Sequence, residues 1–231
     1  MPRLAENGLK EKCGVFGIYA PGKDVGQMTY MGLFALQHRG QESAGIAITD
    51  GRTVVLEKDR GLVAEVFTPQ RMERLHGNLA IGHVLYGKTD TQSNVESAQP
   101  LAVTSRRGSL ALAHNGQITN AAILRAELSE RGYLFRTDSD IEVIASLIAQ
   151  SEAPDLNSAL IHTLKRLTGA YALVVLTPDR VIGIRDPHGI RPLSLGRIDG
   201  GYVLASETCA FDTIGAEFVR PVKPGELVSI G

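Results

Sequence analysis

The sequence has almost no net charge and very little cysteine. Its 231 residues include 24 Lys and Arg against 25 Asp and Glu, which gives a formal net charge of −1. This balance excludes a bulk electrostatic grip on nucleic acid or on an anionic membrane. Only two cysteines are present, Cys13 and Cys209, so we expect no disulfide framework and a reduced, cytoplasmic environment.

Membrane, targeting and cofactor signatures are also missing. The first twelve residues carry five charges and no apolar core of the length that a signal peptide needs, and the later apolar runs are only as long as strands. The six histidines show no spacing typical of a metal site, and there is no Walker-type phosphate loop. We therefore expect a protein that binds neither membrane nor nucleic acid and holds no metal.

What the sequence does contain is an ordinary globular composition, with 43% hydrophobic and 21% charged residues. No repeat, linker or low-complexity tract divides it, so we expect one domain. Apolar runs and turn signals predict strands at residues 13–19, 44–49, 53–58, 79–85, 109–114, 170–176, 181–185, 193–195, 202–205 and 227–230. Periodicity and capping residues predict helices at 27–37, 120–131, 141–150 and 156–167. This pattern favours a layered α+β domain over a βαβ fold.

Cys13 opens an apolar strand directly behind the charged prefix of residues 1–12. One interpretation is a small buried core residue, the commoner fate of a lone cysteine. The other is that cleavage after Lys12 makes Cys13 the N-terminal residue. Its α-amine, with an ordinary pKa of about 7.7 to 8.0, would then accept the thiol proton, so that one residue supplies both nucleophile and base.

Five short runs carry a resemblance to a known family: CGVFG at 13–17, LQHRGQESAG at 36–45, VESAQP at 95–100, AHNGQI at 113–118 and DPHGIRPL at 186–193. In this order they resemble the glutaminase domain of the glutamine phosphoribosylpyrophosphate amidotransferases, which are class II, N-terminal-nucleophile glutamine amidotransferases of purine biosynthesis. The resemblance implies a glutaminase domain over residues 13–231, behind a propeptide-like prefix at 1–12. It also implies the four-layer αββα sandwich of N-terminal-nucleophile hydrolases, with two antiparallel sheets face to face and helices outside.

The resemblance further implies the chemistry of the site. Cys13 attacks the glutamine side-chain amide and forms a thioester, releasing ammonia and then glutamate. The oxyanion hole is assigned to the Asn115 side chain and the Gly116 backbone N–H, although Asn-Gly is also the strongest two-residue signal for a hairpin turn. Arg39 is placed beside the nucleophile, where the residues alone are also typical of a solvated cation at a helix end. Asp140 is assigned to the glutamine α-amino group, a role that a helix N-cap can share.

One position departs from the family pattern. Where the family has an arginine that pairs with the glutamine α-carboxylate and a loop that closes over glutamine, this sequence has Leu85, Tyr86, Gly87 and Lys88. Lys88 supplies a point charge but not the planar fork of a guanidinium. We therefore expect impaired glutamine binding or a shifted substrate. The alternatives are a cysteine amidohydrolase whose redesigned loop serves another amide, an inert domain that keeps the fold, and a papain-like pairing of a cysteine with a histidine.

The family's second domain is expected to be missing. In the intact family enzyme the ammonia passes to a phosphoribosyltransferase domain marked by an adjacent acidic pair, and this sequence has no two consecutive acidic residues. The resemblance implies glutamine as substrate, that domain as a missing partner, and a homo-oligomeric parent. We expect no cofactor in this fragment. An iron–sulfur cluster or a magnesium ion is left open for a parent protein, because the cluster of the propeptide-bearing branch uses cysteines beyond residue 231.

Overall fold

Two antiparallel sheets form the centre of the protein, and the computed structural model describes residues 13–86 and 95–231. The first sheet contains β1 (Cys13–Tyr19), β2 (Ser43–Thr49), β3 (Val54–Arg60), β4 (Leu79–Leu85), β9 (Ser194–Ile198), β10 (Gly201–Ala205) and β11 (Glu217–Pro221). The second contains β5 (Leu101–Ser105), β6 (Gly108–Ile118), β7 (Gly169–Leu176), β8 (Val181–Arg185) and β12 (Leu227–Ile230). Their orders are β11-β9-β10-β1-β4-β2-β3 and β12-β8-β7-β6-β5.

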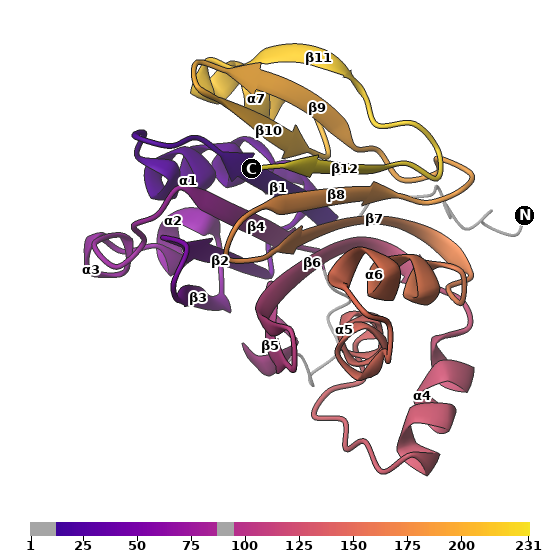
Figure 1. Ribbon diagram of the computed structural model, residues 1–231. Coiled ribbons are helices and arrows are strands. Elements are labelled where there is room, and N and C mark those ends of the chain that lie inside the picture. The colour runs from indigo at the N-terminus through magenta and orange to yellow at the C-terminus, as the bar shows by residue number, and fades with distance from the viewer. Residues whose placement is uncertain (1–12, 87–94) are drawn as a thin grey trace, which may run out of the picture.

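Helices cover the outer faces of both sheets (Figure 1). They are α1 (Val25–Ala35), α2 (Val63–Val66), α3 (Pro69–Met72), α4 (Ala121–Glu130), α5 (Asp140–Gln150), α6 (Leu156–Leu164) and α7 (Cys209–Ile214), with short 3-10 turns η1 (Gln37–Arg39) and η2 (Val95–Ser97). Helices α1 and α7 pack together on the seven-stranded sheet, whereas α5 packs on the five-stranded sheet with α4 and α6 beside it. The order helix, sheet, sheet, helix confirms the predicted four-layer sandwich.

Small side chains let the two sheets pack closely. The core between them is built mainly from alanine and β-branched residues, among them Val15, Ala47, Ile81, Ala111, Ala113, Ala172 and Val174. At Gly17 a Cβ would lie only 2.9 Å from Val181 Cγ1 of the opposite sheet. Alternate residues of a strand face the same side of the sheet. Residues at the strand ends that are in phase with this core therefore also face the opposite sheet.

Most of the predicted elements are present within a few residues of their expected positions. The strand predicted at 109–114 is longer than expected, because β6 continues through residues 115 and 116 to Ile118. Elements α2, α3, β5, α7 and β11 were missed. Each has only four to six residues, and the helices among them are too short to display a helical period.

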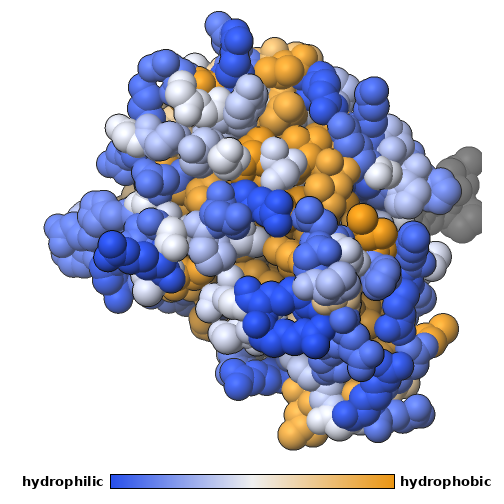
Figure 2. Space-filling model, viewed as in Figure 1, coloured by the Kyte–Doolittle hydropathy of each residue, from blue (hydrophilic) through white to orange (hydrophobic). Residues whose placement is uncertain are grey.

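The surface carries apolar side chains on one face. Figure 2 shows them gathered among hydrophilic neighbours. The edge strand β11 exposes Phe218 and Val219, and its register with β9 shifts between Phe218 and Arg220, which marks a bulge. Across residues 13–86 and 95–231, no helix combines the length and the apolar character needed to cross a membrane.

We predict that Ile81→Ala lowers the free energy of unfolding by about 2–5 kcal/mol, because Ile81 is fully buried between the sheets and its truncation leaves a cavity. The same substitution at Ile123, which is 65% exposed on α4, should change it by less than about 0.5 kcal/mol. Urea unfolding followed by circular dichroism measures both variants. Equally small effects would show that the layer between the sheets is not the main core.

Candidate active site

Cys13 is the first residue of β1 and is half-buried. It pairs in register with Leu85 at the end of β4, and Leu85 pairs with Ser43 at the start of β2. Directly opposite residues of an antiparallel ladder share a face, so the three side chains form a row across the sheet. The row faces the five-stranded sheet, because the core residues Val15 and Ile81 lie at even spacing from it on the same strands.

A buried histidine joins the two sheets next to this row. His83 lies two residues before Leu85 on β4, and its Nε2 is 3.0 Å from the backbone oxygen of His114 on β6. A carbonyl oxygen only accepts, so His83 donates from Nε2. The Asn115-Gly116 segment follows directly on β6. His83 pairs with Val15, two residues after Cys13, and it contacts His114, directly before Asn115. The contact therefore brings the Cys13 end of β1 close to this segment of β6.

Asn115 offers a hydrogen-bond donor at this point. Its side chain is 1% exposed, and its Nδ2 has no hydrogen-bond partner among the described residues. A buried donor without a partner costs about 1–3 kcal/mol, and an anionic oxygen of a bound molecule would satisfy it. Asn115 pairs with Ala172 and Gly116 with Tyr171 inside the β6–β7 ladder. The hairpin-turn interpretation of Asn-Gly is therefore wrong.

Backbone geometry requires glycine at position 116. Its φ of +142° lies in a region that residues with side chains rarely adopt. A Cβ there would lie 2.0 Å from the carbonyl oxygen of Ala170 on the neighbouring strand. The absence of a side chain therefore lets β6 and β7 approach each other closely at this residue.

Arg39 is held against Cys13. The guanidinium Nε donates to the backbone oxygen of Cys13 at 2.8 Å, and Nη1 pairs with the carboxylate of Glu207. The Arg39 side chain is only 4% exposed, so its interpretation as a solvated cation at a helix end is wrong. Sequence reasoning missed Glu207, which is 168 positions away from Arg39, because no local pattern connects the two.

Asp140 is the first residue of α5, and Ser139 before it is the N-cap, so the N-cap interpretation of Asp140 is wrong. Instead, Asp140 Oδ2 accepts the backbone N–H of Ile118 at 2.8 Å. Burial raises the pKa of Asp140, and this hydrogen bond and the charge of Arg125 only partly oppose the rise. Since Ile118 is two residues after Gly116 on β6, Asp140 lies at the same end of the five-stranded sheet.

The remaining predicted residues belong to the segment after β4. Tyr86 directly follows the strand and is 41% exposed. Lys88 and the prefix at 1–12 lie outside the described residues. Within the described part of the chain, no three His, Cys, Asp or Glu side chains gather in a way that could hold a metal ion.

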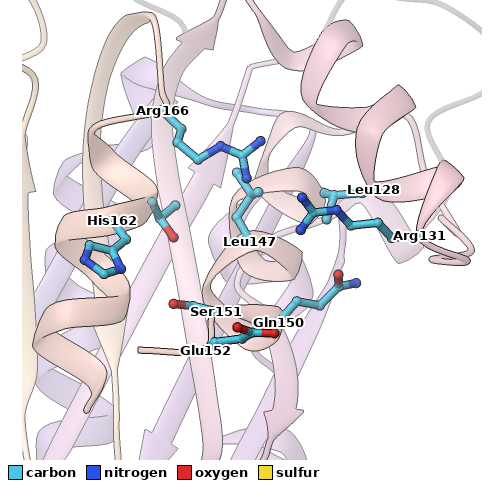
Figure 3. Close-up of a pocket in the computed structure, with 9 residues that line it drawn as sticks. Leu128, Arg131, Leu147, Gln150, Ser151, Glu152, His162 and Arg166 are labelled. Atoms are coloured by element: carbon cyan, nitrogen blue, oxygen red, sulfur yellow. The ribbon is translucent and has the colours of Figure 1, made fainter. Parts of the chain in front are cut away.

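A separate pocket of about 240 Å³ lies on the helical side of the five-stranded sheet (Figure 3). It opens between α4, α5 and α6, and the guanidinium groups of Arg131 and Arg166 point toward its centre. Arg166 is already paired with Glu127 on α4. No cysteine and none of the predicted site residues lines this pocket, so we place the candidate active site at the ends of the sheets instead.

Comparison with known proteins gives a consistent result. A family model described as a glutamine amidotransferase domain matches residues 88–213. The amidophosphoribosyltransferase of Synechococcus elongatus is 48% identical over 96% of this chain, and that of Bacillus subtilis is 47% identical over 98% of it. These matches cover 46% and 48% of the two relatives, so the chain spans about half their length.

A solved structure is similar over almost the whole chain. It is the glutamine phosphoribosylpyrophosphate amidotransferase from B. subtilis complexed with ADP and GMP, with a TM-score of 0.89 and 46% sequence identity. The alignment covers 94% of this chain and 47% of that one. The similarity therefore extends to both sheets and to the strand ends that carry the candidate site.

Burial keeps both site histidines neutral. Burial is the main cause that lowers the pKa of His83 to about 4; the hydrogen bond to His114 opposes it and the charge of Lys58 adds to it. Burial also lowers the pKa of His114 to about 3, with smaller contributions from His83 and Arg191. Both imidazoles are thus buried and neutral at any pH above about 5.

We predict that the free energy of unfolding falls as the pH drops from about 6.5 toward 4. The unfolded chain, with an ordinary histidine pKa of 6.5, binds protons that the folded chain does not, which costs about 2 kcal/mol per histidine at pH 5. Urea unfolding at pH 7, 6 and 5 measures this. The slope should be shallower in His83→Gln and unchanged in His76→Gln, whose histidine is exposed. An identical slope in His83→Gln would contradict a neutral buried His83.

Proposed function

The chain belongs to the glutamine amidotransferase domain family, and from this premise we propose that it hydrolyses the side-chain amide of glutamine to glutamate and ammonia. The observation that carries the proposal is the contact between His83 and His114, which joins the Cys13 end of β1 to the Asn115-Gly116 segment of β6. A thiol nucleophile beside a buried side-chain donor that lacks an acceptor is the arrangement that acyl transfer needs.

In the proposed reaction, cleavage after Lys12 frees the α-amine of Cys13, which takes the thiol proton. The thiolate then attacks the amide carbon, and the electron pair of the C=O bond moves onto the oxygen. Asn115 Nδ2 and the Gly116 N–H donate to this oxyanion, each contributing about 2.7–4 kcal/mol to the transition state. The C–N bond breaks as the α-ammonium of Cys13 protonates the leaving nitrogen, and water hydrolyses the resulting thioester to glutamate.

Strand pairing supports this assignment. Because Asn115 and Gly116 are held in the β6–β7 ladder, their donors need no rearrangement when the charge develops. We assign Asp140 to the α-ammonium group of glutamine, since its carboxylate is tied to Ile118, two residues beyond Gly116. Arg39 holds the Cys13 backbone.

We further propose that Leu85 weakens glutamine binding. Its side chain lies in the row with Cys13 and Ser43, at the position where related amidotransferases have the arginine that pairs with the α-carboxylate. A charge-assisted hydrogen bond contributes about 1.5–3 kcal/mol, and an unpaired buried carboxylate costs more. Leucine supplies neither a charge nor a donor at this position.

The apolar side chain of Leu85 also favours a second candidate function, in which the substrate is an amide that has no α-carboxylate. Such a substrate would use the same nucleophile and the same oxyanion donors. It would bury its apolar end against Leu85, and this burial is favourable. A domain that keeps the fold without turnover is the remaining alternative.

We also propose how this domain acts within the whole protein. A phosphoribosyltransferase domain is the proposed partner that receives the ammonia. The parent protein is proposed to be a homo-oligomer and to be located in the cytoplasm. We propose residues 1–12 as a propeptide and residues 13–231 as the glutaminase domain. We propose no resident cofactor for this domain, because its only cysteines, Cys13 and Cys209, cannot supply the four thiolates of an iron–sulfur cluster.

We predict that a diazo-ketone analogue of glutamine forms one covalent adduct, at Cys13, in chains that have lost residues 1–12. Mass spectrometry with peptide mapping measures the adduct and the N-terminal residue together. Cys209→Ser should keep the adduct, and Cys13→Ser should lose it. An intact prefix with no adduct would contradict the proposal and favour the inert domain.

We predict that Leu85→Arg lowers the KM for glutamine by about ten- to a hundredfold with a smaller change in kcat, because the guanidinium restores a bidentate carboxylate contact. Glutamate release at varied glutamine measures this. Leu134→Arg makes the same change on an 88% exposed residue and should leave KM unaltered. Turnover of 4-aminobutanamide, which lacks the carboxylate, should fall in Leu85→Arg. An unaltered KM for glutamine would show that Leu85 does not face the carboxylate.

A further inference from the structure

We propose that Glu207 is a positioning residue for Cys13 and that it acts through Arg39. The inference rests on the proposed role of Cys13 as nucleophile. Glu207 lies between β10 and α7, far from Cys13 in the sequence, and none of the motifs that predict the site includes it. Its carboxylate nevertheless ends a chain of contacts that leads to the backbone of the nucleophile.

The first link of this chain is the guanidinium of Arg39. Its Nε donates to the Cys13 backbone oxygen at 2.8 Å, and its Nη1 donates to Glu207 Oε1. The Arg39 side chain is almost completely buried, so its charge requires anionic partners inside the protein. Removing the Glu207 carboxylate would take a charged partner from this guanidinium and weaken the geometry of its contact with Cys13.

The second link fixes the carboxylate itself. His38 Nε2 lies 3.0 Å from Glu207 Oε2, and His38 Nδ1 lies 3.0 Å from the backbone oxygen of Ala35. His38 therefore bridges the Glu207 carboxylate and the backbone that ends α1. Glu207 contacts Arg39 through one oxygen and His38 through the other, which restricts the orientation of its carboxylate.

The charge of Glu207 is stable in this setting. Burial alone would raise the pKa of the carboxyl group, but the hydrogen bonds and charges of Arg39 and His38 outweigh it and hold the pKa below the usual range. The carboxylate is therefore ionised at neutral pH and remains a charged acceptor for Arg39.

The third link ties Ser206, the residue directly before Glu207, to β1. The Ser206 Oγ accepts the N–H of Val15 at 3.0 Å, and the Ser206 N–H donates to the Val15 oxygen at 3.0 Å. This double contact continues the β1–β10 pairing beyond its last partners, Phe16 and Ala205. Ser206, the residue before Glu207, is therefore anchored to Val15, two residues from the nucleophile, by backbone and by side chain.

A terminal nucleophile needs such anchoring. Once the prefix is removed, no preceding residue holds Cys13, and its position depends on strand pairing with Leu85 and on the contact at its carbonyl oxygen. A displacement of about 1 Å can cost a hundredfold in rate. Because Glu207 acts on the nucleophile, its loss should lower kcat and leave the binding of glutamine nearly unchanged.

The test compares Glu207→Gln and Glu207→Ala in glutamate release. We expect kcat to fall about ten- to a hundredfold in Glu207→Ala and less in the nearly isosteric Glu207→Gln, with KM within about threefold of the starting value. Glu217→Gln removes the carboxylate of the exposed Arg197–Glu217 pair and should leave both constants unchanged. A kcat within twofold in Glu207→Ala would overturn the proposal, as would an effect confined to KM.

A double-mutant cycle tests whether Glu207 acts through Arg39. In an Arg39→Lys background, Glu207→Ala should lower kcat by less than about threefold, because the link is already broken. Independent, multiplicative losses would overturn this route. Thermal unfolding tests whether each variant is folded. If Glu207→Ala is not folded, Glu207→Gln replaces it in the cycle.

A measurement independent of turnover separates this proposal from the proposed function. Amide hydrogen exchange in the full chain should accelerate across residues 13–19 in Glu207→Ala and stay unchanged in Glu217→Gln. Equal exchange in both would overturn the positioning role even if glutamine is hydrolysed. A chain that exchanges as expected but releases no glutamate and forms no Cys13 adduct would instead contradict the proposed function.

Discussion

The contact between His83 and the backbone oxygen of His114 is the constraint on which the candidate site depends. Each sheet has its own register, and neither register alone says where Cys13 lies relative to Asn115. The imidazole crosses from β4 to β6 and sets that relation at one point. The His83 side chain is buried and neutral, so the contact avoids the cost of an isolated charge between the sheets. Small residues in the layer around it allow the approach.

Much of this arrangement can be predicted from sequence, and the exceptions have physical causes. Alternating apolar runs predict the strands, and the short motifs predict Cys13, Asn115 and Gly116 as site residues. The prediction of a hairpin turn at Asn115 is wrong, because strand pairing with β7 outweighs the preference of Asn-Gly for a turn. The prediction that Arg39 is exposed is wrong, because the buried guanidinium pairs with Glu207, a residue that becomes its neighbour only in the folded chain. Local pattern predicts what a segment prefers, and tertiary contacts decide which preference is met.

Leu85 illustrates how one side chain can separate fold from specificity. It keeps the register that aligns Cys13 with Ser43, since backbone pairing does not depend on the charge of the side chain. In the proposed site, its chemistry affects only which substrate can bind in front of the row. The proposed nucleophile Cys13 and the proposed oxyanion donors at residues 115 and 116 belong to other strands, so the proposal assigns bond cleavage and choice of substrate to different parts of the sandwich.

The irregular edge strand β11 bears on how the molecule avoids joining to its own copies. An edge strand exposes unpaired backbone groups, and here it also exposes Phe218 and Val219, a combination that invites another strand to add. The bulge between Phe218 and Arg220 breaks the straight ladder that such an addition requires. Pro221 then removes a backbone donor at the end of the strand. The seven-stranded sheet can thus keep an apolar border without becoming a template for fibrils.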